Sequence, residues 1–139
     1  MTSGSSRSEV TMPMELRLLV PMQQALPLPV RLRYTVTDPY AVSIVFSGPD
    51  EEVVWVFARD LLAEGLGLPR GQGDVRIRPE LRDGRRLVMI GLASPDGTAE
   101  LEADACAIAQ FIELTEMVVP RGDEHTVVNV DKALADLLG

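Results

Sequence analysis

Two glutamates have the spacing that best suits chemistry in this sequence. Glu100 and Glu102 lie two residues apart in a stretch where polar and apolar residues alternate. Alternate residues of a strand project from one face, so the two carboxylates are expected roughly 7 Å apart. Paired carboxylates can serve acid–base or metal chemistry, and they also occur on any solvated sheet face. We interpret the pair as a solvated face and keep a small enzyme using both glutamates as the alternative.

Nucleophilic, redox and zinc chemistry have few residues to use. The chain holds one cysteine, Cys106, and one histidine, His125. A single cysteine cannot form an internal disulfide, and a single histidine cannot build a histidine-based zinc site unaided. We interpret Cys106 as a small packed residue and His125 as a surface or capping side chain. The sequence therefore predicts no enzyme, no metal and no cofactor.

Four arginines alternate with apolar residues on two expected strands, at positions 31, 33, 76 and 78. Such pairs are able to grip phosphates, so a single-stranded nucleic-acid-binding module is an alternative function. Phosphate binding derives its affinity from neutralised charge, however, and the 13 basic and 21 acidic residues leave a net charge of -8. We therefore predict that these arginines are solvated or ion-paired and that the chain binds no nucleic acid.

A surface for a protein partner is the remaining possibility. Residues 55–62 join residue types enriched at interface anchors to a corner between an expected strand and an expected helix. The anchors that we predict from this stretch are Trp55, Phe57, Arg59, Asp60 and Leu62. We expect the helix to turn the charges of Arg59 and Asp60 outward. In the alternative, Trp55, Phe57 and the leucines are simply core.

The elements that position these residues follow from the pattern of apolar residues. Strands are expected at residues 15–20, 30–37, 41–46, 53–57, 75–78, 87–93, 98–103 and 126–130. Helices are expected at 58–66, at 105–118 and from Asp131 onward. Pro120 ends the second helix, because the residue before a proline is pushed out of helical geometry. Turns are expected at Asp83-Gly84 and Ser94-Pro95-Asp96-Gly97.

The order of these elements is a strand meander and a helix, followed by a second meander and a second helix. Consecutive hairpins favour antiparallel pairing, so we predict an α+β fold: antiparallel β-sheets with two main helices. Residues 1–9 are polar and are predicted to form a disordered tail before a single domain at 10–139. The longest charge-free stretch, residues 18–30, holds three prolines in thirteen residues, so no transmembrane helix is expected. This stretch looks excessive for an exposed connection and favours a self-association interface.

One long string resembles a known family. Residues 55–66, preceded by Asp38-Pro39-Tyr40-Ala41-Val42, resemble the SsgA-like family of sporulation and cell-division proteins of actinobacteria. Further matches are Gly73-Asp74-Val75-Arg76, Ser94-Pro95-Asp96-Gly97, Leu101-Glu102-Ala103, and Val119-Pro120 with Gly122, Glu124 and His125. The resemblance covers about residues 15–138, and the string at 55–66 is long enough to be specific.

The resemblance implies a cytoplasmic adaptor without known catalysis that helps place the tubulin-like division protein FtsZ at septum sites during sporulation. It also implies a fold similar to the whirly single-stranded nucleic-acid binders, and homo-oligomers that are trimers. From it we expect FtsZ, other division proteins and the protein itself as partners, location at the division septum, and no membrane insertion. The partner-binding residues named above come from the sequence and not from the family.

Overall fold

The structure is a computed structural model that describes residues 8–138. Most of the predicted tail at 1–9 therefore lies outside the described residues. The first meander consists of β1 (Glu9–Leu18), β2 (Leu26–Thr35), β3 (Ala41–Ser47) and β4 (Glu52–Ala58), and leads into α1 (Arg59–Gly65). The second consists of β5 (Arg70–Gln72), β6 (Val75–Arg82), β7 (Arg85–Ser94) and β8 (Gly97–Asp104), and leads into α2 (Ala105–Val118) and α3 (Glu124–Leu138).

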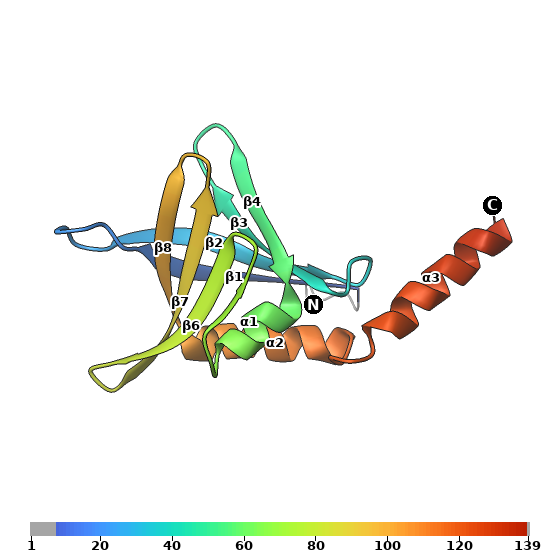
Figure 1. The fold of residues 1–139 in the computed structure, drawn as a ribbon. Helices are drawn as coiled ribbons and strands as arrows, with labels where there is room; N and C mark the ends of the chain where they lie inside the picture. The colour runs from blue at the N-terminus through green and yellow to red at the C-terminus, as the bar shows by residue number, and fades with distance from the viewer. Residues whose placement is uncertain (1–7, 139) are drawn as a thin grey trace, which may run out of the picture.

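The eight strands of residues 8–138 form one sheet in the order β4-β3-β2-β1-β8-β7-β6-β5, and neighbouring strands are antiparallel. The two meanders join where β1 meets β8, through the pairs Arg17↔Glu102 and Leu18↔Leu101. Figure 1 shows the β1–β2 ribbon crossing the other strands at a steep angle, with α1 and α2 at one end of them. The predicted α+β fold, with a meander and a helix repeated twice, is confirmed.

Two tight turns set the register of the second meander. Arg82 pairs with Arg85, so Asp83 and Gly84 form a two-residue loop, with φ of 52° and 77°. Positive φ at both positions is the geometry of a type I′ hairpin, which matches the twist of the flanking strands. Ser94 pairs with Gly97 around Pro95-Asp96. Both turns lie where the sequence predicts them.

β2 begins four residues earlier than expected, because its prolines do not interrupt its pairing with β1. The Val36 amide donates to the Ser8 carbonyl, so these two residues form a hydrogen-bonded pair. Such pairs recur at every second residue of an antiparallel ladder, so the even-numbered residues of β2 bond to β1. The nitrogens of Pro27 and Pro29 therefore point away from β1, toward a side where β3 begins to pair only at Val30. Neither proline removes a ladder bond, so the prolines do not end the strand.

One hydrophobic core lies between the strands and the first two helices. α2 buries Ile108, Phe111, Ile112 and Thr115, which recur at the three- and four-residue spacing of one helix face. α1 adds Leu61 and Leu62 to the same cluster, together with side chains from both meanders. As predicted, α2 ends before Pro120, since Val119 has extended geometry with φ of -139°.

The prediction of a strand at residues 126–130 is wrong, because helix α3 runs from Glu124 to Leu138 without a break. The valines at 127, 128 and 130 are typical of a strand. The turn before these valines favours a helix over a strand. Gly122 takes a positive φ of 101°, and its amide donates a hydrogen bond to the Glu124 carboxylate at 2.8 Å. A helix thus begins seven residues earlier than expected, and it projects away from the sheet (Figure 1).

Candidate interaction surfaces

The corner between β4 and α1 holds a buried arginine. Arg59, the first residue of α1, has an exposed fraction of 0%. Its guanidinium donates to the carbonyl oxygens of Val119 at 2.7 Å and Thr115 at 3.3 Å, at the C-terminal end of α2. It also lies 4.7 Å from the ring centroid of Tyr34. Carbonyl groups at a helix C-terminus carry partial negative charge, so the cation satisfies the end of α2.

Glu124 completes the charge balance at this corner. One carboxylate oxygen accepts from Arg59 Nη2 at 2.7 Å, and the other accepts from the Gly122 amide. Burial raises the pKa of the Glu124 carboxyl, but the bonds from Arg59 and from backbone amides outweigh it, so the pKa lies below its ordinary value. Burial also raises the pKa of the neighbouring Tyr34 phenol. Arg59 therefore joins the starts of α1 and α3 to the end of α2.

Exposed ion pairs surround the same corner. Arg121, in the link between α2 and α3, donates to Asp60 at 3.0 Å and lies 3.9 Å from Glu64. Asp60 and Glu64 belong to α1, so this link is fastened to α1 at its surface as well as in its interior. The base of α3 is consequently held in a defined position.

The five anchors predicted from the sequence lie in β4 and α1, on the two sides of this corner, and most of them are not at the surface. Phe57 and Leu62 are core residues, as the alternative interpretation expects, and Trp55 is partly buried against that core. Asp60 is exposed, as predicted. The expectation that Arg59 turns outward is wrong, because the end of α2 and Glu124 supply partners for its charge inside the protein.

Helix α3 carries an apolar stripe, of which the sequence interpretation expected only the leucines after Asp131. Val127, Val130, Leu134 and Leu137 recur at spacings of three and four residues, which places them on one side of the helix. Val127 packs against the core, whereas Val130, Leu134 and Leu137 are exposed. The three- and four-residue spacing of apolar residues beyond Asp131 continues back through Val130 and Val127, and this spacing is the signal that indicates the whole stripe.

On the second meander, Glu100 and Glu102 belong to a chain of ion pairs. Eight side chains alternate in charge in the order Glu100, Arg78, Glu80, Arg82, Glu102, Arg17, Asp104, Arg85. Glu102 is buried and accepts from Arg17 at 2.7 Å and from Arg82 at 2.8 Å. Burial raises the pKa of its carboxyl, but the bonds from the two arginines lower it overall. The interpretation of this face as simply solvated is therefore wrong for Glu102, and both carboxylates are already neutralised.

The alternating arginines are ion-paired at three of their four positions. Arg31 lies 2.5 Å from Glu52, Arg33 lies 3.0 Å from Glu9, and Arg78 belongs to the chain of ion pairs. Within residues 8–138, Arg76 has no ion pair. These contacts leave little positive charge free for phosphates.

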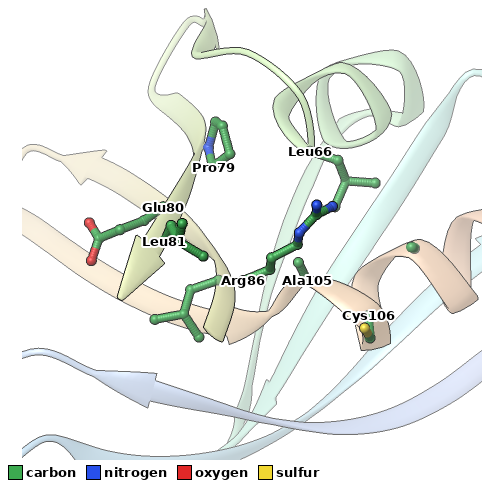
Figure 2. A pocket seen from close by; sticks show the side chains of 9 residues that line it. Leu66, Pro79, Glu80, Leu81, Arg86, Ala105 and Cys106 are labelled. Carbon is green, nitrogen blue, oxygen red and sulfur yellow. The ribbon is translucent and has the colours of Figure 1, made fainter. Parts of the chain in front are cut away.

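A pocket of about 500 Å³ lies between β6, β7 and α2, and Leu66 closes one side of it. Figure 2 shows the Arg86 side chain reaching across it toward Leu66, and Cys106 at its margin. Cys106 is exposed, so its interpretation as a packed residue is wrong, because the first turn of α2 presents it beside this pocket. His125 is exposed, as predicted, and does not line the pocket. The pocket thus has no imidazole beside its thiol.

The described part of the chain has neither a candidate metal site nor a candidate membrane-spanning helix. No group of three or more histidine, cysteine, aspartate or glutamate side chains there is placed to hold a metal ion. No helix there has the length and apolar character needed to cross a membrane.

Comparison with known proteins identifies the family. A family model described as Streptomyces sporulation and cell division protein, SsgA, matches residues 28–124. The chain belongs to the SsgA family. It is 48% identical over 130 residues to the sporulation-specific cell division protein SsgB of Streptomyces coelicolor, which covers 93% of this chain and 95% of that protein. It is 50% identical over 122 residues to SsgB of Saccharopolyspora erythraea, covering 87% of this chain and 86% of the relative.

Solved structures agree with this result. A structure from work on SsgB of Streptomyces coelicolor superposes with a TM-score of 0.81 at 48% identity, covering 89% of this chain and 99% of that one. The crystal structure of an SsgA-like sporulation-specific cell division protein from Thermobifida fusca gives a TM-score of 0.87 at 40% identity, covering 95% of this chain and 98% of that one. The family resemblance of residues 55–66 is confirmed, and the fold is that of SsgB and SsgA-like proteins.

Proposed function

We propose that this protein is a non-enzymatic adaptor in sporulation-specific cell division, which helps recruit FtsZ to septum sites through protein–protein contacts. Relatives that match nearly the whole chain are named sporulation-specific cell division proteins, which supports a role in that process. The two glutamates considered for catalysis are each paired with arginine, which favours an adaptor over an enzyme. FtsZ as the partner rests on the resemblance of residues 55–66.

The apolar stripe of α3 is the observation that carries the proposal. Leu134 and Val130 are about half exposed, on a helix whose base is fixed by the buried Arg59–Glu124 pair and by Arg121. A fixed helix with an uncovered stripe is suited to helix–helix packing between subunits. We propose that α3 mediates self-association, with the trimer implied by the family as its product. The interface expected at residues 18–30 stays a second prediction; this stretch forms the end of β1, the connection to β2 and the first half of β2.

Self-association also supplies a mechanism for recruitment. An FtsZ polymer repeats the same surface, and an oligomer can contact several repeats at once. Linked weak contacts gain roughly 10²- to 10⁴-fold in avidity without any new contact. A protein of this kind gathers polymers at the septum where it is concentrated, and needs no chemistry of its own.

Nucleic-acid binding is the less favoured function. The acidic chain repels phosphate at long range, and Arg31, Arg33 and Arg78 are occupied by carboxylates. Binding of single-stranded DNA at physiological salt, weakened by Arg76→Ala, would favour it.

Co-sedimentation with FtsZ polymers tests the proposed function. We expect the wild type to pellet with polymers, and Leu134→Asp to pellet far less because it is monomeric. Asn129→Asp is the matched control: it adds the same charge on the opposite side of α3, and is expected to pellet like the wild type. A wild type that stays in the supernatant with assembled FtsZ refutes direct recruitment, and equal pelleting of the two variants refutes the role of α3.

A further inference from the structure

β4 is an uncovered edge of the sheet. It begins the strand order, pairs with β3 over all seven of its residues, and has no strand on its other side among the described residues. The opposite edge, β5, is a strand of three residues. Figure 1 shows β4 at the margin of the first meander, leading directly into α1. A row of unpaired amides and carbonyls at an edge is a template for another strand.

The hydrogen bonds at both ends of β4 show which of its backbone groups are free. Gly48 donates to the Glu51 carbonyl, and Arg59 donates to the Tyr40 carbonyl. Both pairs fit the register Ile44↔Trp55, so odd-numbered residues of β4 bond to β3. The amides and carbonyls of Val54 and Val56 therefore point away from the sheet.

The side chains along this edge are apolar and accessible. Val54 and Val56 have exposed fractions of 50% and 57%, and both belong to the face opposite the core. Proteins usually protect such edges with lysine, proline or a bulge. Residues 52–58 contain no lysine, arginine or proline, and they pair with β3 without interruption. The edge thus combines free backbone groups with an apolar surface.

Charge decides between a second copy of the chain and a different protein. Asp50, Glu51 and Glu52 are all exposed at the start of β4, and within the described chain Asp50 and Glu51 have no ion pair. Two copies of β4 paired antiparallel about Trp55 would place Glu52 opposite Ala58 of the other copy. The nearest basic residue, Arg59, is buried, so the acidic turn would meet no basic side chain. Parallel pairing would place the three carboxylates side by side. Like charges directly opposite each other destabilise strand pairing, so the surface fits a partner with basic residues.

We propose that β4 binds an extended segment of a partner protein as an additional antiparallel strand. The segment alternates β-branched residues with polar ones and ends in lysine or arginine, which then lies beside Asp50 and Glu51. Backbone bonds to Val54 and Val56 provide the pairing, and the acidic turn selects the orientation. This site rests on the proposed adaptor function and gives it a docking surface separate from α3.

A peptide titration tests the site directly. The probe is Thr-Val-Thr-Val-Thr-Val-Lys-Lys with blocked ends, followed by NMR of the labelled protein. We expect the Val54 and Val56 amides to shift and to become protected from hydrogen exchange. A probe ending in two glutamates, and one N-methylated at two consecutive central residues, are each expected to bind at least tenfold more weakly. Equal binding of all three probes overturns the proposal.

Two variants separate the edge from the rest of the fold. Val54→Pro removes an amide that β3 does not use, and Val56→Lys adds a charge without altering the backbone. Each variant is expected to bind the probe that ends in two lysines at least tenfold more weakly than the wild type does. Val128→Lys, at an exposed valine of α3 that lies outside the apolar stripe, is the control and is expected to bind like the wild type. Full binding by the folded Val56→Lys variant, or loss of binding in the control, overturns the site.

The peptide and FtsZ assays give distinguishable failures. If FtsZ pelleting persists in both β4 variants, the adaptor function stands and β4 is overturned as its docking surface. If the wild type binds the probe at β4 but does not pellet with FtsZ, the site stands and the proposed function fails.

Discussion

Arg59 and Glu124 lie 65 residues apart in the sequence, and their side chains meet at 2.7 Å inside the protein. The pair is almost fully buried, with side-chain exposed fractions of 0% and 6%. Removing two charges from water is costly, and here that cost is offset because Arg59 donates to a backbone carbonyl and Glu124 accepts from a backbone amide. The pair determines where α3 leaves the body of the protein.

Arg59→Ala is expected to destabilise the fold by about 3–5 kcal/mol, because it leaves Glu124 buried without a counter-charge. It also leaves the Val119 carbonyl without its donor. Urea unfolding of the wild type and the variant measures the difference. Asp60→Lys is the control, because Asp60 is exposed and its change is expected to cost less than about 1 kcal/mol. Equal stability of Arg59→Ala and the wild type would contradict the buried pair.

Acidification is expected to weaken the same junction. The pKa of Glu124 is lower in the folded protein than its ordinary value of 4.5. A carboxyl with a lowered folded pKa contributes stability that is present above its ordinary pKa and is lost as the pH falls through its folded pKa. The wild type should therefore lose its stability advantage over Glu124→Gln as the pH falls from about 5 to about 2. The two free energies of unfolding then approach each other. A difference that stays constant over this range would rule out the ion pair as its cause.

The position of Arg59 shows what the sequence does not contain. Its neighbours, Asp60 on one side and Ala58 on the other, are typical of a helix start at a surface. The partners that make burial possible are the end of α2 and Glu124, and only the tertiary fold brings them to Arg59. Elements with strong local patterns, such as α2 and the turns at Asp83-Gly84 and Pro95-Asp96, were predictable because neighbouring residues decide them.

The start of α3 lies between these two cases. Its valines favour a strand by intrinsic preference, and that preference is outweighed by the Glu124 contacts at the helix start. The half of α3 from Asp131 onward was predicted, while the exposed stripe as a whole was not. The β4 edge was not predictable either, since the sequence does not say which strand ends the sheet.

Glu102→Gln tests the chain of ion pairs on the second meander. Glu102 is buried and accepts from both Arg17 and Arg82, so the neutral amide weakens two charge-assisted bonds and turns a donor toward one arginine. We expect a loss of about 1–3 kcal/mol in the free energy of unfolding. Glu100→Gln is the matched control, because Glu100 is half exposed and meets one arginine at 3.8 Å. If Glu100→Gln costs more than Glu102→Gln, the proposed importance of the buried position is refuted.

Leu134→Asp is expected to change assembly and leave the fold of the subunit intact. Leu134 is half exposed on a helix that projects from the body, so unfolding of the isolated subunit should change by no more than about 0.5 kcal/mol. Light scattering at tens of micromolar should find the wild type as an oligomer and the variant as a monomer, and sedimentation distinguishes three subunits from two. A monomeric wild type would remove self-association from the proposed function.

Gly65→Ala is expected to destabilise the fold, although alanine is the better helix former. Gly65 lies in α1 against β6, and a Cβ atom there would stand 2.3 Å from Ile77 Cγ2 and 2.7 Å from Ile77 Cβ. The gain in helix propensity is about 1 kcal/mol, whereas forcing an extra carbon into a packed core costs about 1–3 kcal/mol. The branched carbon of Ile77 cannot move without shifting β6, so we expect the clash to exceed the gain.

Gly67→Ala is the control for this comparison. A Cβ atom at Gly67 would lie 3.9 Å from the Glu64 carbonyl oxygen, which is ordinary van der Waals contact. The two glycines are two residues apart, and the same substitution should lower the free energy of unfolding at Gly65 and leave it nearly unchanged at Gly67. Gly65→Ala combined with Ile77→Leu removes the Cγ2 atom next to the new carbon and keeps the volume of the side chain. If that double variant is no more stable than Gly65→Ala alone, the contact with Ile77 is not the source of the cost.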